Sequence, residues 1–362
     1  MRTPMKLGAA VLSAALLLTT SAQAQAADTN ATASANGGGS RNHFDLQAHR
    51  GGIGLTVEST LASFAKGIET GVSTLELDLQ ITKDGREVIT HDRKISDTKC
   101  RDTAPVTPND SQFPYVGKYI KDLTFAQVRS LDCGSLTQPQ FPGQQASPGA
   151  KMPTLAEVFA LADSYRASQV KFNIETKVEA GAPQETAPRE QFVDVALREI
   201  NAAHMQSRVS IESFDWGSLR LVQARQPQIP TVALTNKDFL QAGQPGKSPW
   251  LGGIDADDFG GDLVAAAASL GFTAISPVHG TPQNGTVTDA NYVPYVTADM
   301  VRRAHAARMQ VIPWTVDDKP TMRTLIGMGV DGLITDYPNE LREVMAESGM
   351  KLPQSFQLQP GH

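Results

Sequence analysis

The stretch LQAHRGGIGLTVESTLASFAKGIETGVSTLELDLQITKDGREVITHD, from Leu46 to Asp92, is the basis for predicting the fold of this chain. It begins with a short strand, Leu46 to His49. Ser59 to Thr70 then carries apolar side chains at helical spacing, and Gly71 stands where a glycine commonly ends a helix. A second strand begins at Thr74. The opening unit is therefore predicted to be strand, helix, strand.

The second strand, Thr74 to Thr82, alternates strictly between apolar and polar side chains. Successive side chains of a strand point to opposite faces. One face therefore carries Leu75, Leu77, Leu79 and Ile81, and the other carries Glu76, Asp78 and Gln80. In a barrel surrounded by helices, the apolar face packs outward and the carboxylates point into the barrel mouth.

A hairpin is predicted after this strand, because Asp84-Gly85 is typical of a two-residue turn that needs positive φ. Pairing outward from that turn matches Ile81 with Val88 and Asp78 with His91. This register predicts that His91 lies directly opposite Asp78 on the carboxylate face.

Six further strands are predicted, with helical patterns between most of them, at Val170 to Lys177, Val209 to Phe214, Thr231 to Leu234, Phe272 to Ser276, Gln310 to Val316 and Gly332 to Thr335. With the first two, they make eight parallel strands, the number in a TIM-type (β/α)8 barrel. Short right-handed crossovers make this closed α/β barrel the simplest topology. An open doubly wound sheet is the alternative, but no GxGxxG or P-loop pattern supports it.

The first 26 residues have the pattern of a signal peptide. Arg2 and Lys6 precede an apolar run from Leu7 to Thr19, and small residues suited to cleavage follow. An uncleaved membrane anchor is the alternative. Residues 27–43 are rich in Ala, Asn, Gly and Ser, which predicts a flexible leader. We therefore expect an exported protein, periplasmic or secreted, that keeps no stable membrane insertion after cleavage.

The chain has 362 residues and a formal net charge of −6, with no basic run. This composition argues against nucleic acid as a partner. It leaves the oligomeric state open. The two cysteines, Cys100 and Cys133, are expected to pair in an oxidising compartment.

Residues 93–152 lose the regular pattern and contain both cysteines. The segment is too long for an ordinary loop, so we interpret it as an inserted small subdomain or lid. The barrel is then predicted to span residues 44–345, followed by a C-terminal tail at 346–362.

Three carboxylates are predicted to meet at the mouth of the barrel. Glu76 and Asp78 lie on the second strand, and Glu175 follows the same alternating pattern on a later one. Like charges a few ångströms apart raise each other's pKa, so such a cluster needs a cation. Oxygen ligands favour a hard divalent ion, Ca²⁺ or Mg²⁺.

Two histidines and two cations also end strands at this mouth, namely His49, His91, Arg50 and Lys177. A pair of histidines suits general acid and base work, and the cations suit an anionic centre, which favours phosphoryl chemistry. Trp314 also stands near the end of a strand, where it could either belong to the core or wall the substrate site. A Ser/His/Asp hydrolase is the competing reading, but the chain lacks a GxSxG motif.

A set of short motifs in the chain resembles the bacterial glycerophosphodiester phosphodiesterases. They are His49-Arg50-Gly51, Glu58-Ser59-Thr60-Leu61, Glu76-Leu77-Asp78, Lys83-Asp84-Gly85, His91-Asp92, Asn173-Ile174-Glu175-Thr176-Lys177, Ser213-Phe214, Trp314-Thr315-Val316 and Thr335-Asp336. They occur in order across nearly the whole mature chain. The family often has Pro-Glu-Asn-Thr where this chain has Val57-Glu58-Ser59-Thr60, a change at the start of a helix.

The resemblance implies a phospholipase-C-like barrel that holds one divalent ion on the residues matching Glu76, Asp78 and Glu175. His49 and His91 would be the acid and base. Arg50 and Lys177 would bind phosphate, and we add Trp314 and Phe214 to the substrate-binding residues.

The predicted reaction is hydrolysis of a glycerophosphodiester, a small-molecule substrate, to sn-glycerol 3-phosphate and an alcohol. A phospholipase-D-like or teichoic-acid-trimming enzyme is one alternative. An exported solute-binding protein is the alternative outside enzymes. Which histidine is the acid, and whether a cyclic phosphate forms, stays open.

Overall fold

The computed structural model describes residues 43–358. The predicted signal peptide, the leader apart from His43, and residues 359–362 lie outside the described residues. Within the described range, no helix combines the length and the apolar character that crossing a membrane requires.

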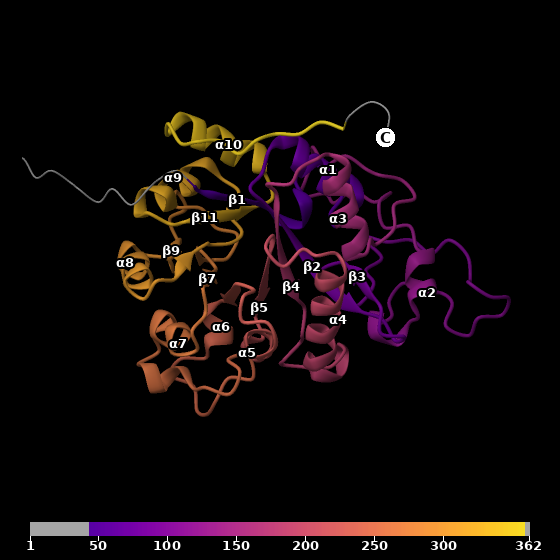
Figure 1. The fold of residues 1–362 in the computed structure, drawn as a ribbon, viewed down its shortest axis with the longest axis horizontal. Helices are drawn as coiled ribbons and strands as arrows, with labels where there is room; N and C mark the ends of the chain where they lie inside the picture. Colours follow the sequence, from indigo (N-terminus) through magenta and orange to yellow (C-terminus); the bar gives the residue numbers. More distant parts are fainter. Residues whose placement is uncertain (1–42, 359–362) are drawn as a thin grey trace, which may run out of the picture. The chain divides into compact units, whose positions relative to one another are not determined.

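Eight parallel strands form the centre of the fold, which confirms the predicted barrel (Figure 1). They are β1 (Asp45–Ala48), β2 (Thr74–Ile81), β4 (Lys171–Thr176), β5 (Val209–Ser213), β6 (Thr231–Thr235), β7 (Ala274–Pro277), β10 (Gln310–Val311) and β11 (Gly332–Thr335). Their order around the sheet is β10, β7, β6, β5, β4, β2, β1, β11. Neighbours in this order therefore follow the chain, as in a (β/α)8 barrel.

The sheet closes between its two end strands through single hydrogen bonds. Asp331 donates its N–H to the carbonyl of Val311 at 2.9 Å, Ile334 to Pro313 at 3.0 Å, and Val316 to Ile334 at 3.0 Å. The strand predicted from Gln310 to Val316 is only two residues long as β10. Pro313 has no N–H to contribute to a ladder, which accounts for the interruption.

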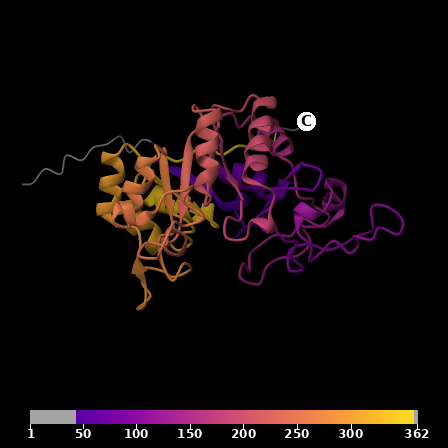
Figure 2. The same ribbon diagram turned by 90° about the horizontal axis from the view of Figure 1, so that it is seen from below.

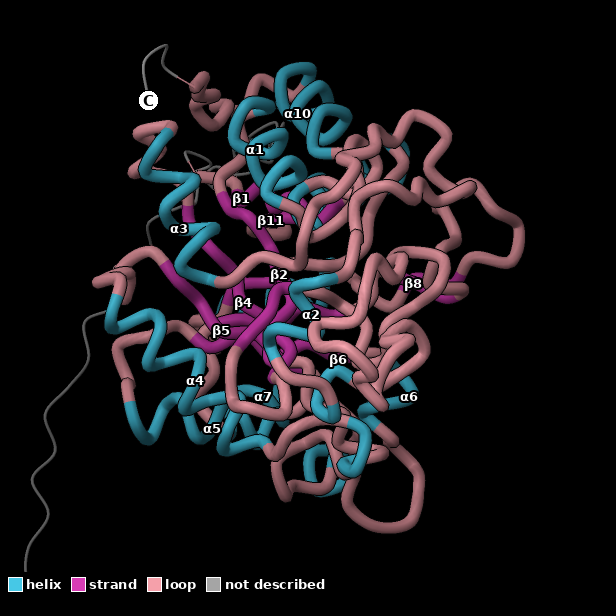
Figure 3. The backbone as a smooth tube through the Cα atoms, turned by 90° about the vertical axis from the view of Figure 1, so that its right-hand side faces the viewer, coloured by secondary structure: helices cyan, strands magenta, loops and turns pink. Residues whose placement is uncertain are grey.

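Each barrel strand is followed by at least one helix before the next strand or the end of the fold. The helices are α1 (Leu61–Thr70), α2 (Phe125–Ser130), α3 (Leu155–Ser164), α4 (Arg189–Ala202), α5 (Trp216–Arg225), α6 (Lys237–Leu240), α7 (Leu263–Ser269), α8 (Ala298–Ala306), α9 (Lys319–Met328) and α10 (Pro338–Glu347). Figure 3 shows the strands in the centre, with α1, α3, α4 and α5 outside them and long loops gathered on the other side.

Helix α1 ends at Thr70, as its sequence predicts, but begins at Leu61, two residues after the predicted start at Ser59. The Thr60 side chain accepts a hydrogen bond from the N–H of Ser63, and the Ser63 side chain accepts one from the N–H of Thr60. This capping box satisfies two backbone donors that the first turn leaves free. Gly71 ends the helix at a φ of 87°, a left-handed conformation that glycine adopts without steric cost.

The interior of the barrel is divided between polar and apolar side chains. Gln47, Glu76, Asp78, Asn173 and Glu212 are buried on the strands β1, β2, β4 and β5. Across from them, a separate apolar cluster consists of Val232, Ala274, Ile312 and Ile334, with Trp314 packed against it. The predicted outward face of β2 is confirmed, since Leu75, Leu77, Leu79 and Ile81 join the main core.

The predicted register of the hairpin is wrong by one residue. Strand β3 (Glu87–Ile89) pairs Ile81 with Glu87 and Leu79 with Ile89. The loop has three residues, because Thr82 donates its N–H to the carbonyl of Arg86, and the Thr82 hydroxyl also accepts from the N–H of Arg86. Asp78 consequently pairs with Thr90, whose N–H donates to its carbonyl at 2.9 Å. His91 reaches the barrel mouth because the chain has left the ladder after Ile89.

Residues 93–152 pack around a hydrophobic cluster of their own that includes Tyr115, Ile120, Leu123 and Val128. The predicted disulfide between Cys100 and Cys133 is present in this cluster. Figure 2 shows this purple segment on the opposite side from the orange helices of the second half. We call residues 93–152 the insert.

The short elements lie outside the barrel ladder. Strands β8 (Gly280–Thr281) and β9 (Val293–Pro294) form a two-stranded sheet, and 3-10 turns occur at His49–Gly51, Ile120–Asp122, Pro183–Glu185 and Ala256–Phe259. After α10, the N–H of Phe356 donates to the carbonyl of Ile68 at 3.2 Å. The segment after α10 therefore folds back onto α1.

Candidate active site

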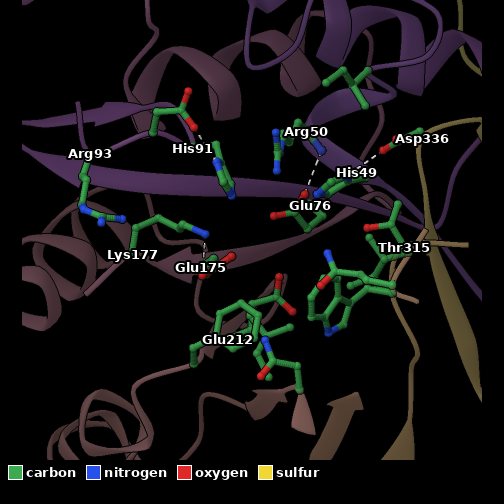
Figure 4. A pocket seen from close by; sticks show the side chains of 18 of the residues that line it. His49, Arg50, Glu76, His91, Arg93, Glu175, Lys177, Glu212, Thr315 and Asp336 are labelled. Carbon is green, nitrogen blue, oxygen red and sulfur yellow. Dashed lines mark hydrogen bonds and ion pairs between the residues drawn. The ribbon is translucent and has the colours of Figure 1, made fainter. Parts of the chain in front are cut away.

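A cavity of about 750 Å³ opens at the carboxyl ends of the strands. Eight of the predicted site residues line it, from six different strands or the turns after them: His49, Arg50, Glu76, His91, Glu175, Lys177, Phe214 and Trp314. The ninth, Asp78, is buried beneath them, 3.5 Å from Arg50 Nε and from Lys177 Nζ. Figure 4 shows the charged groups around one common space. The fold thus brings every predicted site residue together.

Three buried carboxylates lie close together at the base of this cavity. Ligand oxygens of Glu76, Asp78 and Glu175 all lie within 4.8 Å of one another. The register explains their proximity, because Asp78 pairs directly with Glu175 on the adjacent strand and Glu76 is two residues earlier on β2. Side chains two residues apart share a face of the strand.

Asp78 shows that these residues fit a hard cation. Both of its carboxylate oxygens are buried, and neither has a hydrogen-bond partner among the described residues. Arg50 and Lys177 approach these oxygens only to 3.5 Å, so both oxygens of Asp78 can still accept a further ligand. Oxygen donors at this spacing match the ligands that Ca²⁺ and Mg²⁺ prefer, so the triad could hold a metal ion.

The pKa values of the three acids differ because their neighbours differ. Burial and the charge of Asp78 hold the pKa of Glu76 well above its usual range. Burial raises the pKa of Glu175 to about 7, although the ammonium of Lys177 at 2.9 Å opposes this. Asp78 is buried as well, yet Lys177, His91 and Arg50 hold its pKa below its usual range. Asp78, which lies between Arg50 and Lys177, is therefore the acid that stays ionised.

Glu212 is a fourth carboxyl group that the sequence reasoning missed. It pairs with Glu175 on the neighbouring strand and accepts a hydrogen bond from Asn173 Nδ2 at 2.6 Å. Burial, followed by the charge of Glu175, holds the pKa of Glu212 well above its usual range. The alternation of Val209 to Ser213 places Glu212 on the same inner face as Glu175, which is the signal that could have identified it.

His49 is held by an aspartate from the last barrel strand. Its Nδ1 lies 2.5 Å from Asp336 Oδ1 (Figure 4). Asp336 in turn donates its backbone N–H to Asp317 Oδ1 at 2.8 Å. Burial and the charge of Asp336 raise the pKa of Asp317 to about 8. Asp317 was not identified from the sequence, and Asp336 was noted only as part of a motif.

His91 has a similar partner. Its Nδ1 lies 2.7 Å from Asp92 Oδ1. Burial and the positive charges of Arg50 and Lys177 lower the pKa of His91 well below its usual value. A ring in this environment is neutral at pH 7, and one nitrogen can accept a proton.

Arg50 adopts a left-handed conformation at the end of the first strand, with a φ of 51°. Its backbone N–H donates to Glu76 Oε2 at 2.8 Å, and its guanidinium donates to Glu58 at 2.8 Å. The next residue must be glycine, because Gly51 has a φ of 84° and a Cβ there would come within 2.6 Å of Ser63 Oγ. The tight turn therefore fixes where the guanidinium lies.

Aromatic rings line part of the cavity. Lys177 Nζ lies 5.8 Å from the centre of the Phe214 ring, and the Phe214 ring makes an edge contact with Trp314 at 5.4 Å. Trp314 is fixed by a hydrogen bond from its Nε1 to the carbonyl of Ser276 at 2.9 Å. This wall could contact the less polar part of a substrate.

Comparisons with known proteins agree with this arrangement. The sequence model of the glycerophosphoryl diester phosphodiesterase family matches residues 49–340. A glycerophosphodiester phosphodiesterase of Caldanaerobacter subterraneus is 27% identical over 302 residues, which are 83% of this chain and 98% of that protein.

Solved structures share the fold. A Silicibacter pomeroyi structure described as a glycerophosphoryl diester phosphodiesterase has 27% identity and a TM-score of 0.68, covering 86% of this chain and 95% of the other. An Oleispira antarctica phosphodiesterase, solved with the product sn-glycerol-3-phosphate, has 20% identity and a TM-score of 0.59, covering 83% and 96%.

Proposed function

Because the chain belongs to the glycerophosphoryl diester phosphodiesterase family, we propose that it hydrolyses glycerophosphodiesters to sn-glycerol 3-phosphate and an alcohol with two histidines as acid and base. The single observation that carries this mechanism is the pairing of each histidine with an aspartate on either side of the acidic triad. The Oleispira antarctica relative, which holds sn-glycerol-3-phosphate, supports the product assigned here.

Arg50 and Lys177 bind the phosphoryl group in this proposal. Both are mostly buried, and both lie beside Asp78, so their charges are fixed at the base of the cavity. A guanidinium presents planar donors to phosphate oxygens, whereas an ammonium acts as a point charge. Together they orient the diester and stabilise the negative charge that grows on its oxygens as the bond breaks.

His49 and His91 move protons in this proposal. In each ring, Nδ1 faces an aspartate, which holds Nδ1 protonated and leaves Nε2 for the substrate. One Nε2 takes the proton of the nucleophile, either water or the glycerol 2-hydroxyl. Attack by water gives glycerol 3-phosphate directly, whereas attack by the 2-hydroxyl gives a cyclic phosphate that water then opens to glycerol 3-phosphate. The other gives a proton to the alkoxide that leaves phosphorus, so that the alcohol departs neutral.

Glu76, Asp78 and Glu175 would hold one divalent cation, Ca²⁺ or Mg²⁺. When bound, such an ion supplies positive charge at the phosphoryl oxygens. The convergence of the carboxylate oxygens of these three acids within 4.8 Å of one another, together with the two buried Asp78 oxygens that have no hydrogen-bond partner among the described residues, supports this assignment.

Two features of the protein outside the reaction centre belong to the same proposal. The predicted signal peptide supports export, and N-terminal sequencing of the mature protein from a periplasmic or secreted fraction tests it.

The insert places Arg93 against Glu179 and Glu185 of the β4–α4 connection. This contact at the rim of the cavity supports a role as a lid that limits substrate size.

Product analysis tests the proposal directly. The protein is incubated with mixed glycerophosphodiesters and defined amounts of Ca²⁺ or Mg²⁺, and the products are identified by mass spectrometry. We expect glycerol 3-phosphate and the free alcohol. Release from a lysophospholipid or a teichoic acid alone would favour a larger substrate, and binding without turnover would favour a solute-binding protein. Full activity of a His49→Ala, His91→Ala double variant in EDTA would refute the mechanism.

A further inference from the structure

Lys99 of the insert lies between two carboxylates that belong to the barrel mouth. Its Nζ is 2.8 Å from Glu58 Oε1 and 2.9 Å from Asp92 Oδ2. The lysine side chain is only 21% exposed, and Glu58 is buried. One ammonium group therefore bridges two acids that are 34 positions apart in the chain.

Each of these acids uses its second oxygen to hold a group of the proposed active site. Glu58 Oε2 accepts a hydrogen bond from Arg50 Nη1 at 2.8 Å. Asp92 Oδ1 lies 2.7 Å from His91 Nδ1. The contacts form one continuous path from Arg50 through Glu58, Lys99 and Asp92 to His91.

This path of contacts depends on the positive charge of Lys99 at its centre. Arg50, followed by Lys99, holds the pKa of the buried Glu58 well below its usual range. Without the ammonium, the two carboxylates would lose their common partner and repel each other. Gln138, also from the insert, donates to Glu58 Oε1 at 3.0 Å, but an amide cannot supply that charge.

The disulfide fixes where Lys99 stands. Lys99 is the residue directly before Cys100, and Cys100 is bonded to Cys133. Both cysteines, Lys99 and Glu58 line one small cavity between the insert and the barrel. The neighbouring residues Arg101 and Asp132 exchange two backbone hydrogen bonds at 2.8 and 3.0 Å. The segment that carries Lys99 is thus held both by the disulfide and by backbone hydrogen bonds.

We infer that Lys99, anchored by the Cys100–Cys133 disulfide, is a positioning residue that orients His91 and Arg50 together. The expected effect on kcat and KM rests on the proposed function, whereas the expected effect on the orientation of the His91 ring does not. The insert then has a part in the reaction besides shaping access to the cavity.

The variant Lys99→Met tests this inference, because Met has similar length and no charge. Groups that orient a catalytic or ligand residue typically contribute about 10 to 100-fold to activity. We expect kcat to fall by that order, with KM for the diester also rising because Arg50 is displaced. Lys99→Arg should recover most of the activity, since a guanidinium can bridge two carboxylates. The Cys100→Ser, Cys133→Ser double variant should show a smaller loss of the same kind.

Lys151→Met is the matched control. Lys151 lies in the same insert, and within residues 43–358 its Nζ donates only to the carbonyls of Ser130 and Leu131, at 3.0 and 2.8 Å. Its loss should leave kcat and KM within about twofold of the parent protein, because its contacts do not reach His91 or Arg50.

Nitrogen NMR of the histidine rings gives a readout that does not need turnover. The Nδ1 and Nε2 shifts of His91 should change in Lys99→Met, because Asp92 no longer fixes the tautomer. The shifts of His49, whose partner is Asp336, should stay the same. If the parent protein releases no glycerol 3-phosphate but the His91 shifts respond in this way, the proposed function falls and the positioning role stands.

Two results would overturn the inference. One is a Lys99→Met variant with unchanged His91 shifts. The other is an equal change in Lys99→Met and Lys151→Met, which would assign the effect to folding of the insert.

Discussion

The carboxylate of Asp336 lies 2.5 Å from Nδ1 of His49, although 287 positions separate the two residues in the chain. Strands β1 and β11 pair directly, with Ala48 opposite Thr335, so the residues that follow each strand meet at the mouth. In the proposed mechanism, this contact selects which nitrogen of His49 faces the substrate.

Replacing Asp336 by Asn should reduce kcat by about 10²- to 10⁴-fold with little change in KM, because the amide no longer holds Nδ1 protonated. Steady-state kinetics with glycerophosphoethanolamine measure this. Glu347→Gln is a suitable control, since Glu347 is an exposed partner of Arg323. An Asp336→Asn enzyme with unchanged kcat would show that His49 needs no tautomer control.

The two acids that pair across β4 and β5 should respond differently to neutralisation. Glu175→Gln should weaken Ca²⁺ or Mg²⁺ binding at least about tenfold by removing a ligand, as seen by titration calorimetry. Glu212→Gln should leave binding nearly unchanged, because Glu212 is not among the three acids whose oxygens converge and its carboxyl group already accepts a hydrogen bond from Asn173 Nδ2. Equal binding losses in Glu175→Gln and Glu212→Gln would place Glu212 among the ligands.

Addition of EDTA should abolish turnover in the parent protein.

Asp317 should make the protein less stable as the pH rises. Its pKa is about 8 in the folded protein and near 3.8 when unfolded, so the folded state binds the extra proton between these values. Unfolding free energy then falls with pH in this window, with a slope below about 1.4 kcal/mol per pH unit.

Asp317→Asn resembles the protonated carboxyl group, and its Oδ1 can still accept from the N–H of Asp336. The variant should therefore show a flatter profile and greater stability near pH 8. Urea unfolding at pH 5, 6.5 and 8, with EDTA present throughout, measures the difference. Parallel profiles for variant and parent protein would contradict the assignment.

Arg93 should restrict the substrates that enter the cavity. It joins the insert to Glu179 and Glu185 at 2.9 and 2.5 Å, and Tyr119 donates its hydroxyl to Glu185 at 2.9 Å. Arg93→Ala should raise kcat/KM for a bulky diester such as glycerophosphoinositol relative to glycerophosphoethanolamine, by a few fold. Arg101→Ala, at an exposed arginine of the same insert, is the control. An unchanged ratio would count against a lid.

Local patterns in the sequence were enough to predict most of the architecture. The two-residue period of β2 and β4 identified the buried acids Glu76, Asp78 and Glu175 without any knowledge of tertiary contacts, because alternation is a property of each strand alone. The number of strands and the helices between them then led to the barrel, and the barrel brought the strand ends to one mouth.

The hairpin shows where local patterns stop being sufficient. A two-residue turn at Asp84-Gly85 and the observed three-residue loop differ by one position, and one position exchanges the two faces of a strand. The choice between them depends on hydrogen bonds that the Thr82 side chain makes to Arg86 and Asp84.

The sequence by itself determined the barrel, the acidic triad and the two histidines, because these follow from period, spacing and strand ends. Only the tertiary structure decided the partners of those groups: Asp336 for His49, Glu212 beside Glu175, and Lys99 between Glu58 and Asp92. These contacts join segments from distant parts of the chain or from the insert, and their distances depend on how the barrel closes and how the disulfide holds the insert. No local period encodes such distances, so they had to be measured in the folded molecule.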